Sequence, residues 1–217
     1  MAAKQQQFTK ILISVPGPWA SRDAVVQAIT ASGSGFHFAG RQLVETATHR
    51  AFHLDVLNPD VMFANTTGGV GRYRTEPASA TGVVVRLTAP GGTVEMARQA
   101  VQAAAALVRA GGHRVRVDSS GGEREGAEWL ELAGRGDPAA LCRALGEVEE
   151  AAEGARSWGM GSFGVPDVIG EGRGTAEVVV FLHRVVVEGV KGVKVEAVAE
   201  RRDEARFNPF GVWRVKR

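Results

Sequence analysis

The first half of the chain is a series of short apolar segments separated by polar turns. Lys10 to Val15 predicts a buried strand, and Ser21 stands where the N-cap of a helix over Arg22 to Ala31 would lie. Gln42 to Thr46 and Ala51 to Leu57 flank a polar turn and predict a hairpin. The pattern therefore begins with a strand, a helix and two further strands.

A second strand–helix–strand unit follows. Gly82 to Thr88 predicts a strand, Thr93 can cap a helix over Val94 to Ala110, and His113 to Asp118 alternates like a strand. Between the two units, Asn58 to Ala80 is rich in Gly and Pro and predicts a long loop.

The second half is more acidic, and its pattern predicts a different mixture of elements. Val-rich Thr175 to Glu188 is compatible with a strand, but Glu177, Arg184 and Glu188 share a face only on a helix, so a helix is expected. The other expected elements are helices over Glu123 to Ala133 and Pro138 to Glu153, an extended segment over Ser157 to Val165, a charged turn over Arg201 to Arg206, and strands over Val193 to Ala199 and Val212 to Val215.

This order predicts an α+β protein with mostly antiparallel pairing. Residues 1–118 resemble a ferredoxin-like lobe, an antiparallel sheet with helices on one face. Residues 119–217 predict a second α+β lobe packed against the first. No linker separates the two, so one compact unit is expected.

Composition narrows the compartment and the partner class. The 217 residues carry 26 Lys and Arg against 24 Asp and Glu, a net charge of +2, which gives no reason to expect a nucleic acid or an anionic membrane as partner. Cys142 is the single cysteine, so no internal disulfide can form. No apolar run approaches the length of about 20 residues that spans a membrane. A cytoplasmic protein is expected, and the oligomeric state stays open.

Sequence motifs for cofactors and metals are weak. Gly159, Gly161 and Gly164 match a dinucleotide-binding spacing, but Pro166 and Asp167 follow where a helix should begin. The chain has no phosphate-binding loop motif and none of the usual zinc motifs. Neither a cofactor nor a metal ion is expected.

Three segments in the second half resemble a bacterial family, the domain of unknown function numbered four-two-six-one. They are His113 to Gly121 followed by Trp129-Leu130, Ser157 to Asp167, and Phe207 to Arg214. The resemblance implies a cytoplasmic bacterial protein without an assigned activity. The family often has a histidine at the positions of Arg124 and Gly161, so an enzymatic role is less expected for this chain.

The last of these segments is expected to be structural. Asn208 and Pro209 predict a turn that directs the aromatic side chains of Phe207, Phe210 and Trp213 into the second lobe.

Two functional hypotheses follow. The first is a non-enzymatic interaction protein, of the kind that immunity proteins represent, that binds a protein partner. Its acidic face would be Glu149, Glu150 and Glu153 at the C-terminal end of a helix, where they oppose the helix dipole.

The alternative is an enzyme of unknown type with a cleft between the lobes, lined by His53, Asp55, Arg114, Asp118 and Arg124. Arg86, Arg114 and Arg116 are expected to share a sheet face with His53 and to meet the acidic helices. Aromatic residues follow the apolar register of the strands instead of this face, which argues against RNA binding there.

Overall fold

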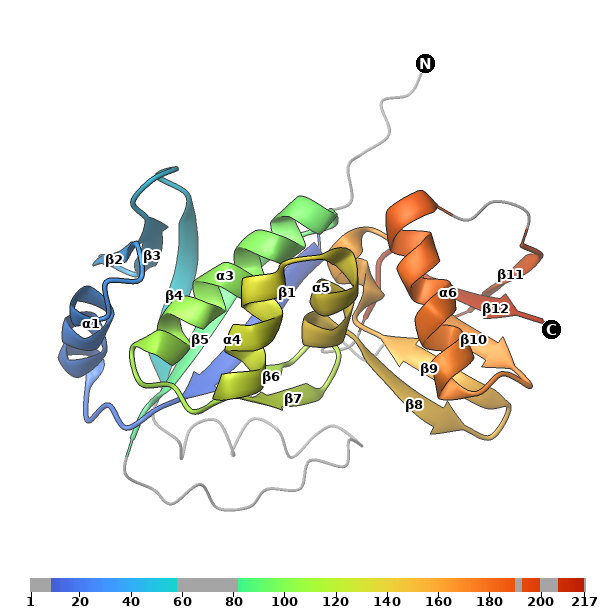
Figure 1. The fold of residues 1–217 in the computed structure, drawn as a ribbon, viewed down its shortest axis with the longest axis horizontal. Coiled ribbons are helices and arrows are strands. Elements are labelled where there is room, and N and C mark those ends of the chain that lie inside the picture. The colour runs from blue at the N-terminus through green and yellow to red at the C-terminus, as the bar shows by residue number, and fades with distance from the viewer. Residues whose placement is uncertain (1–8, 58–81, 190–192, 200–206, 217) are drawn as a thin grey trace.

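The computed structural model describes residues 9–57, 82–189, 193–199 and 207–216, which form two sheets side by side (Figure 1). We call the first sheet with its helices the first lobe, and the second sheet with its helix the second lobe. The mixed α+β class expected from the sequence is confirmed.

The first lobe is built on a seven-stranded antiparallel sheet. In spatial order its strands are β2 (Phe36–Ala39), β3 (Gln42–Glu45), β4 (Ala51–Leu57), β5 (Val84–Gly91), β1 (Thr9–Pro16), β6 (Arg114–Val117) and β7 (Gly122–Glu125). The order β4-β5-β1-β6, with a helix after β1 and another after β5, is the split βαβ arrangement of ferredoxin-like folds.

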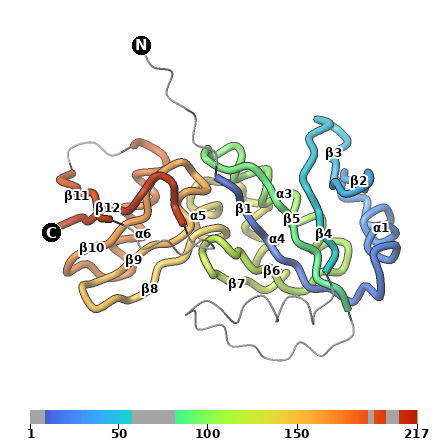
Figure 2. Tube along the Cα trace, turned by 180° about the vertical axis from the view of Figure 1, so that it is seen from behind, coloured from blue at the N-terminus to red at the C-terminus, as the bar shows by residue number. Residues whose placement is uncertain are grey.

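Helices cover one face of this sheet, and Figure 2 shows the opposite face from behind. They are α1 (Arg22–Ala31), α3 (Val94–Arg109), α4 (Gly126–Arg135) and α5 (Pro138–Leu145). Ser21, Thr93 and Asp137 cap α1, α3 and α5 with their side chains. These short-range signals explain why the helix starts could be predicted.

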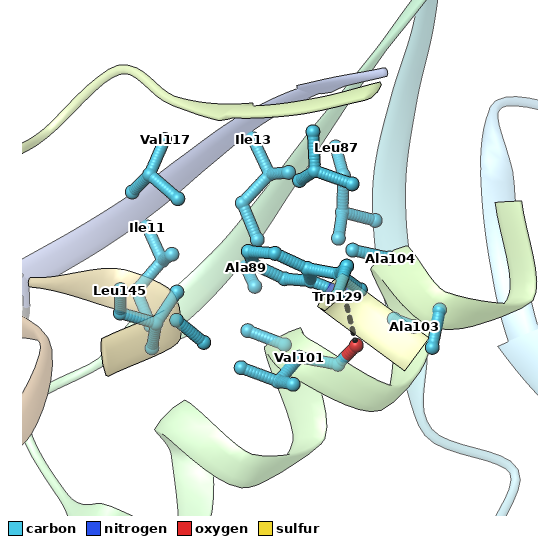
Figure 3. Close-up of a cluster of buried hydrophobic side chains, with 14 of the residues drawn as sticks. Ile11, Ile13, Leu87, Ala89, Val101, Ala103, Ala104, Val117, Trp129 and Leu145 are labelled. Atoms are coloured by element: carbon cyan, nitrogen blue, oxygen red, sulfur yellow. Dashed lines mark hydrogen bonds between the residues drawn. The ribbon is translucent and has the colours of Figure 1, made fainter. Parts of the chain in front are cut away.

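The core of the first lobe centres on Trp129 of α4, which is completely buried between α3 and the sheet (Figure 3). Its indole Nε1 donates a hydrogen bond to the carbonyl oxygen of Val101 at 3.1 Å. Alanines of α3, including Ala103 and Ala104, leave room for the indole and for close approach to the strands. The sheet therefore has one apolar, covered face and one polar face.

The second lobe is a five-stranded sheet whose strand order is β11-β12-β10-β9-β8. The strands are β8 (Glu147–Ala151), β9 (Gly154–Trp158), β10 (Asp167–Glu171), β11 (Val195–Val198) and β12 (Val212–Val215). Helix α6 (Thr175–Glu188) packs on one face of this sheet through Val178, Leu182 and Val185. The helix predicted over Thr175 to Glu188 is thus confirmed.

The predicted acidic helices are partly wrong. Residues 123–125 belong to β7, and α5 ends at Leu145, so Glu149 and Glu150 lie on β8 and Glu153 lies in the turn after it. These three carboxylates therefore oppose no helix dipole. Gly146 ends α5, and β8 then forms a hairpin with β9 across Ala152 and Glu153, although Glu and Ala favour a helix over a strand.

Other differences concern short elements. Strands β2 and β10 were not predicted, and the segment 157–165 is extended only to Trp158 before a 3₁₀ turn, η1 (Met160–Phe163). The predicted loop over 58–80 and the predicted turn over 201–206 lie outside the described residues. The predicted division after residue 118 also differs from the place where the sheets change, because β7, α4 and α5 pack in the first lobe and the second sheet begins at Glu147.

Candidate functional site

The polar face of the first sheet brings together part of the predicted cleft. On β4, His53 Nε2 lies 3.2 Å from Asp55 Oδ1, and Arg41 also bonds that carboxylate. The pKa of Asp55 is therefore held below its usual value, chiefly by the Arg41 hydrogen bond. Asp55 pairs in register with Arg86 of β5, which continues the polar row across the sheet.

Asp118 lies farther along the same face, just after β6. Arg86 Nε and Arg116 Nε lie 3.8 and 3.4 Å from its two carboxylate oxygens, and Ser14 Oγ donates a hydrogen bond at 3.1 Å. Burial nevertheless outweighs these contacts and raises the pKa of Asp118 above its usual value. The side chain is thus a mostly buried carboxyl group beneath two arginines.

The remaining two predicted residues do not complete a cleft. Arg114 shares the polar face but bonds Glu125 at 3.0 Å and approaches Glu123 at 3.9 Å, both on β7. From the sequence, Arg114 was expected to meet acidic helices. In the structure it meets two glutamates of the strand β7 instead. Arg124 stands at the alternate register position and reaches the C-terminal end of α5 on the helix side. The five residues therefore lie on two faces of one sheet.

A concavity lies where α5 meets α6, between the two lobes. It encloses about 630 Å³, a volume typical of ligand sites. Small and aliphatic side chains dominate its lining, among them Ala139 of α5 and Val179 and Val180 of α6. Arg124, Arg135, Arg143, Glu147 and His183 supply its charged and polar groups. We call this concavity the α5–α6 groove.

Arg124 fixes the end of α5 that forms one wall of the groove. Its guanidinium donates to the carbonyl oxygens of Arg143 and Gly146 at 3.0 and 3.3 Å, and to Glu147 Oε2 at 3.0 Å. The carbonyls at the end of α5 thereby gain a cationic donor. The predicted site residue Arg124 consequently holds the wall in place and is not free to bind a ligand.

The other two arginines of the groove are more exposed. Arg135 and Arg143 form surface ion pairs with Asp137 and Glu128, at 3.1 and 2.8 Å. Exposed pairs of this kind contribute little to stability, so either guanidinium can exchange its partner for an anionic group of a ligand. The lining carries three arginines and one glutamate, which favours an anion.

Cys142 and His183 both line the groove, yet they do not form a reactive pair. Burial raises the pKa of the Cys142 thiol to about 12, so the thiol stays protonated and a poor nucleophile. The sequence did not single out His183 or the α6 wall. A signal was present, because Ala176, Val180 and His183 follow helical spacing opposite the buried residues of α6.

The predicted acidic face is partly occupied by contacts within the second lobe. Trp158 Nε1 donates to Glu149 Oε1 at 2.6 Å, and Arg214 approaches Glu153 at 3.1 Å. Glu150 is exposed.

The predicted aromatic terminus needs a correction. Phe207 is 45% exposed, and Phe210 and Trp213 are only half-buried, whereas Asn208 is 3% exposed. The predicted turn is present, since Gly211 N bonds the carbonyl oxygen of Asn208 at 2.9 Å. The segment is therefore held by a buried amide more than by its aromatic rings.

A buried polar cluster surrounds that amide. Asn208 Nδ2 donates to Asp167 Oδ2 and to the carbonyl oxygen of Val165, each at 3.0 Å, and its Oδ1 accepts from Phe210 N. Asp167 also accepts from Met160 N at 3.0 Å. The glycine motif around Gly161 thus forms part of the packed junction, with Thr9 Oγ1 bonded to the Gly161 carbonyl at 2.8 Å.

Within the described ranges, no three His, Cys, Asp or Glu side chains cluster as a metal site would require. Nor do the helices in those ranges include one with the length and apolarity that crossing a membrane demands. Comparison of the chain with protein-family models, with curated proteins and with solved structures finds no match in any of the three.

Proposed function

We propose that this chain is a non-enzymatic cytoplasmic binding protein that holds its partner in the α5–α6 groove. The observation that carries the proposal is the groove itself, a largely apolar concavity of about 630 Å³ with arginines around it. Apolar concavities with a few polar groups are the usual form of binding sites. The resemblance to a bacterial family and the single cysteine both support a bacterial protein of the cytoplasm.

The groove favours a ligand group with an apolar body and a negative charge. An apolar ligand group that covers the aliphatic wall removes apolar surface from water, which favours binding. Arg135 and Arg143 can each donate hydrogen bonds to a carboxylate or a similar anion. The partner is thus a protein segment that presents an apolar side chain beside an acidic one.

The enzymatic alternative has less support. His53 contacts Asp55, Asp55 also bonds Arg41, and Asp118 contacts two arginines and Ser14. Arg124 lies on the other side of the sheet. The Cys142 thiol has a pKa raised to about 12. We therefore propose binding as the function and assign no reaction.

Anilinonaphthalene sulfonate, an apolar anion that fluoresces when shielded from water, probes the groove directly. We expect saturable binding at one site per chain. Ala139→Trp fills the groove from the α5 wall and should abolish that binding. Ala127→Trp, at an exposed position of α4 outside the groove, is the matched control and should leave it unchanged.

Both variants must melt near the wild-type temperature, because partly unfolded proteins also bind this dye. Replacement of Arg143 by Gln should weaken dye binding without changing its stoichiometry. Equal binding by wild type and Ala139→Trp would refute the groove as the site.

A further inference from the structure

Helix α6 presents a mostly apolar stripe that continues past the end of the α5–α6 groove. Ala176, Val180 and His183 line the groove, and Val187 follows at helical spacing outside it. Val180 and Val187 are 60% and 61% exposed. The buried residues of α6 lie on the opposite side of the helix. We call the four residues Ala176, Val180, His183 and Val187 the outer stripe.

The outer stripe sets the length of the segment that can cover it. Ala176 and Val187 are eleven positions apart on one helix, which corresponds to about 17 Å or three turns. Single surface valines are ordinary, but a stripe of three turns beside an apolar concavity marks an interaction surface. The occupant therefore lies along α6 and covers the groove and the outer stripe together.

Backbone hydrogen bonding decides the conformation of the occupant. The walls of the groove are the helices α5 and α6, whose backbone groups bond within each helix. Of the outer strand β8, only Glu147 and Val148 reach the lining. An extended segment would leave the N–H and C=O groups that face these walls without partners beside an apolar surface, which is costly. A helix satisfies its own backbone and packs against the helical spacing of the outer stripe.

Charge selects the sign of the flank of the occupant that faces α5. Arg135 and Arg143 line the groove, and the acidic residues with which they form surface ion pairs do not. Glu147, the one acidic residue of the described lining, is bonded to Arg124. Carboxylates on this flank of the occupant therefore meet arginines, whereas lysines there would meet no acid without a partner.

The other flank of α6 selects neither sign. Glu177, Arg184 and Glu188 are exposed there, and none of them lines the groove. Two acids and one base along this flank accept either charge in a partner. A preference for acidic residues is thus expected only on the side of the occupant that faces Arg135 and Arg143.

From these observations we infer that the α5–α6 groove and the outer stripe bind an amphipathic helix of a partner protein, with acidic residues on the flank beside α5. The inference rests on the proposed function and specifies the structure of the partner segment. Apolar side chains at positions i, i+3 or i+4, and i+7 of that helix cover Val180, Val187 and the groove. The segment need not be helical before it binds, because the contact can order it.

Selection from a library of displayed random peptides reveals the preferred pattern without knowledge of the partner. The peptides have about 16 residues, roughly four helical turns, and the full chain is the target. We expect enriched peptides to carry apolar residues at helical spacing, more Asp and Glu than Lys and Arg, and few prolines. Counter-selection against Ala139→Trp removes peptides that bind elsewhere on the chain.

Fluorescence anisotropy of the most enriched peptide tests the charge preference. Arg143→Glu should weaken its binding about tenfold, and should strengthen binding of a twin peptide that carries lysine in place of its acidic residues. Arg109→Glu, at an exposed position of α3 outside the groove, is the matched control and should leave both affinities unchanged. Circular dichroism of the complex should show more helix than the sum of its two components.

Val187→Glu separates the long helical occupant from a ligand of the groove alone. Val187 does not line the groove, so dye binding should stay unchanged, whereas the peptide should bind about tenfold less tightly because it covers a charge. Ala127→Glu, at an exposed position of α4, places the same charge elsewhere and should leave peptide binding intact.

Three results would overturn the inference while dye binding still supports the proposed function. They are a selection that enriches no peptide, enriched peptides whose apolar residues alternate as in a strand or whose charge is mainly basic, and peptide binding unaffected by Val187→Glu. Dye binding that is absent, or equal in wild type and Ala139→Trp, would instead refute the proposed function, and the inference with it.

Discussion

Single buried polar side chains set the geometry where the second lobe meets its C-terminal segment. Asn208 uses both ends of its amide, bonding Asp167 and Val165 through Nδ2 and Phe210 N through Oδ1. The sequence directed attention to the neighbouring aromatic rings, because bulk is visible in a sequence. The hydrogen bonds that satisfy the buried carboxylate of Asp167 are not visible in a sequence. One donor, Asn208, lies 41 positions away, and another is the backbone N–H of Met160 in η1.

Asn208→Ala should therefore destabilise the protein by about 3 kcal/mol, because it leaves buried acceptors without their donor. Phe207→Ala, at an exposed ring next to it, should change stability by less than about 0.5 kcal/mol. Urea unfolding of the two variants measures the contrast. A larger loss for Phe207→Ala would restore the aromatic side chain as the anchor of this segment.

Asp118 should make stability depend on acidic pH in an unusual direction. Burial raises its pKa in the folded protein above the ordinary 3.8, so the folded state binds the proton more tightly than the unfolded state does. The stabilising contribution is full below pH 3.8 and is lost as pH rises through the folded pKa.

The difference in unfolding free energy between wild type and Asp118→Asn isolates this residue. The stability of wild type relative to the variant should fall as pH rises from 3.8 through the folded pKa of Asp118, and it should stay constant above that pKa. A relative stability that rises with pH would mean that Arg86 and Arg116 outweigh burial.

Helices with a capping side chain or a clear polar face were predictable, whereas a strand built from helix-favouring residues was not. Ser21, Thr93 and Asp137 cap their helices as expected. The spacing of the polar residues in Thr175 to Glu188 also predicted correctly that α6 is a helix. The acidic residues after Leu145 form a strand because β9 pairs with them. The two strands form a hairpin within residues 147–158, but Glu and Ala favour a helix, so residue propensity concealed the pairing.

The end of α5 depends on Arg124, a residue from another element. Arg124→Ala removes donors from the carbonyls of Arg143 and Gly146 and should cost about 2 kcal/mol. Arg124→Lys keeps the charge but lacks the planar set of donors, so it should recover less than half of that loss. Thermal unfolding measures both.

Arg114→Ala is the control for Arg124→Ala, because Arg114 forms its ion pairs on the exposed sheet face. It should cost less than about 1 kcal/mol. Equal losses for the two alanine variants would show that the contacts at the end of α5 are no more than surface ion pairs.

At the scale of the whole molecule, the two lobes share one core. Residues of η1, including Met160 and Phe163, pack in the same apolar cluster as Leu107 of α3 and Leu141 of α5. Gly92 N also bonds the Ser162 carbonyl across the junction at 3.0 Å. The α5–α6 groove arises at this junction, so no single segment of the sequence could reveal it.

The shared core predicts one cooperative unfolding transition. Trp19 and Trp129 report on the first lobe, whereas Trp158 and Trp213 report on the second. Variants that retain tryptophan in only one lobe should show the same urea midpoint by fluorescence and by far-ultraviolet circular dichroism. Two separated midpoints would instead show that the lobes unfold independently.

The acidic strand β8 is the outer strand of the second sheet, and this position gives its carboxylates a protective effect. An outer strand exposes unpaired backbone groups that can template aggregation with strands of other molecules. Glu149 and Glu150 bring negative charge to that edge, so two such edges repel each other at neutral pH. Replacing both residues with Gln would remove this repulsion and leave the edge open to fibril-like stacking. The glutamates of β8 thus help to keep the folded protein from aggregating through this edge.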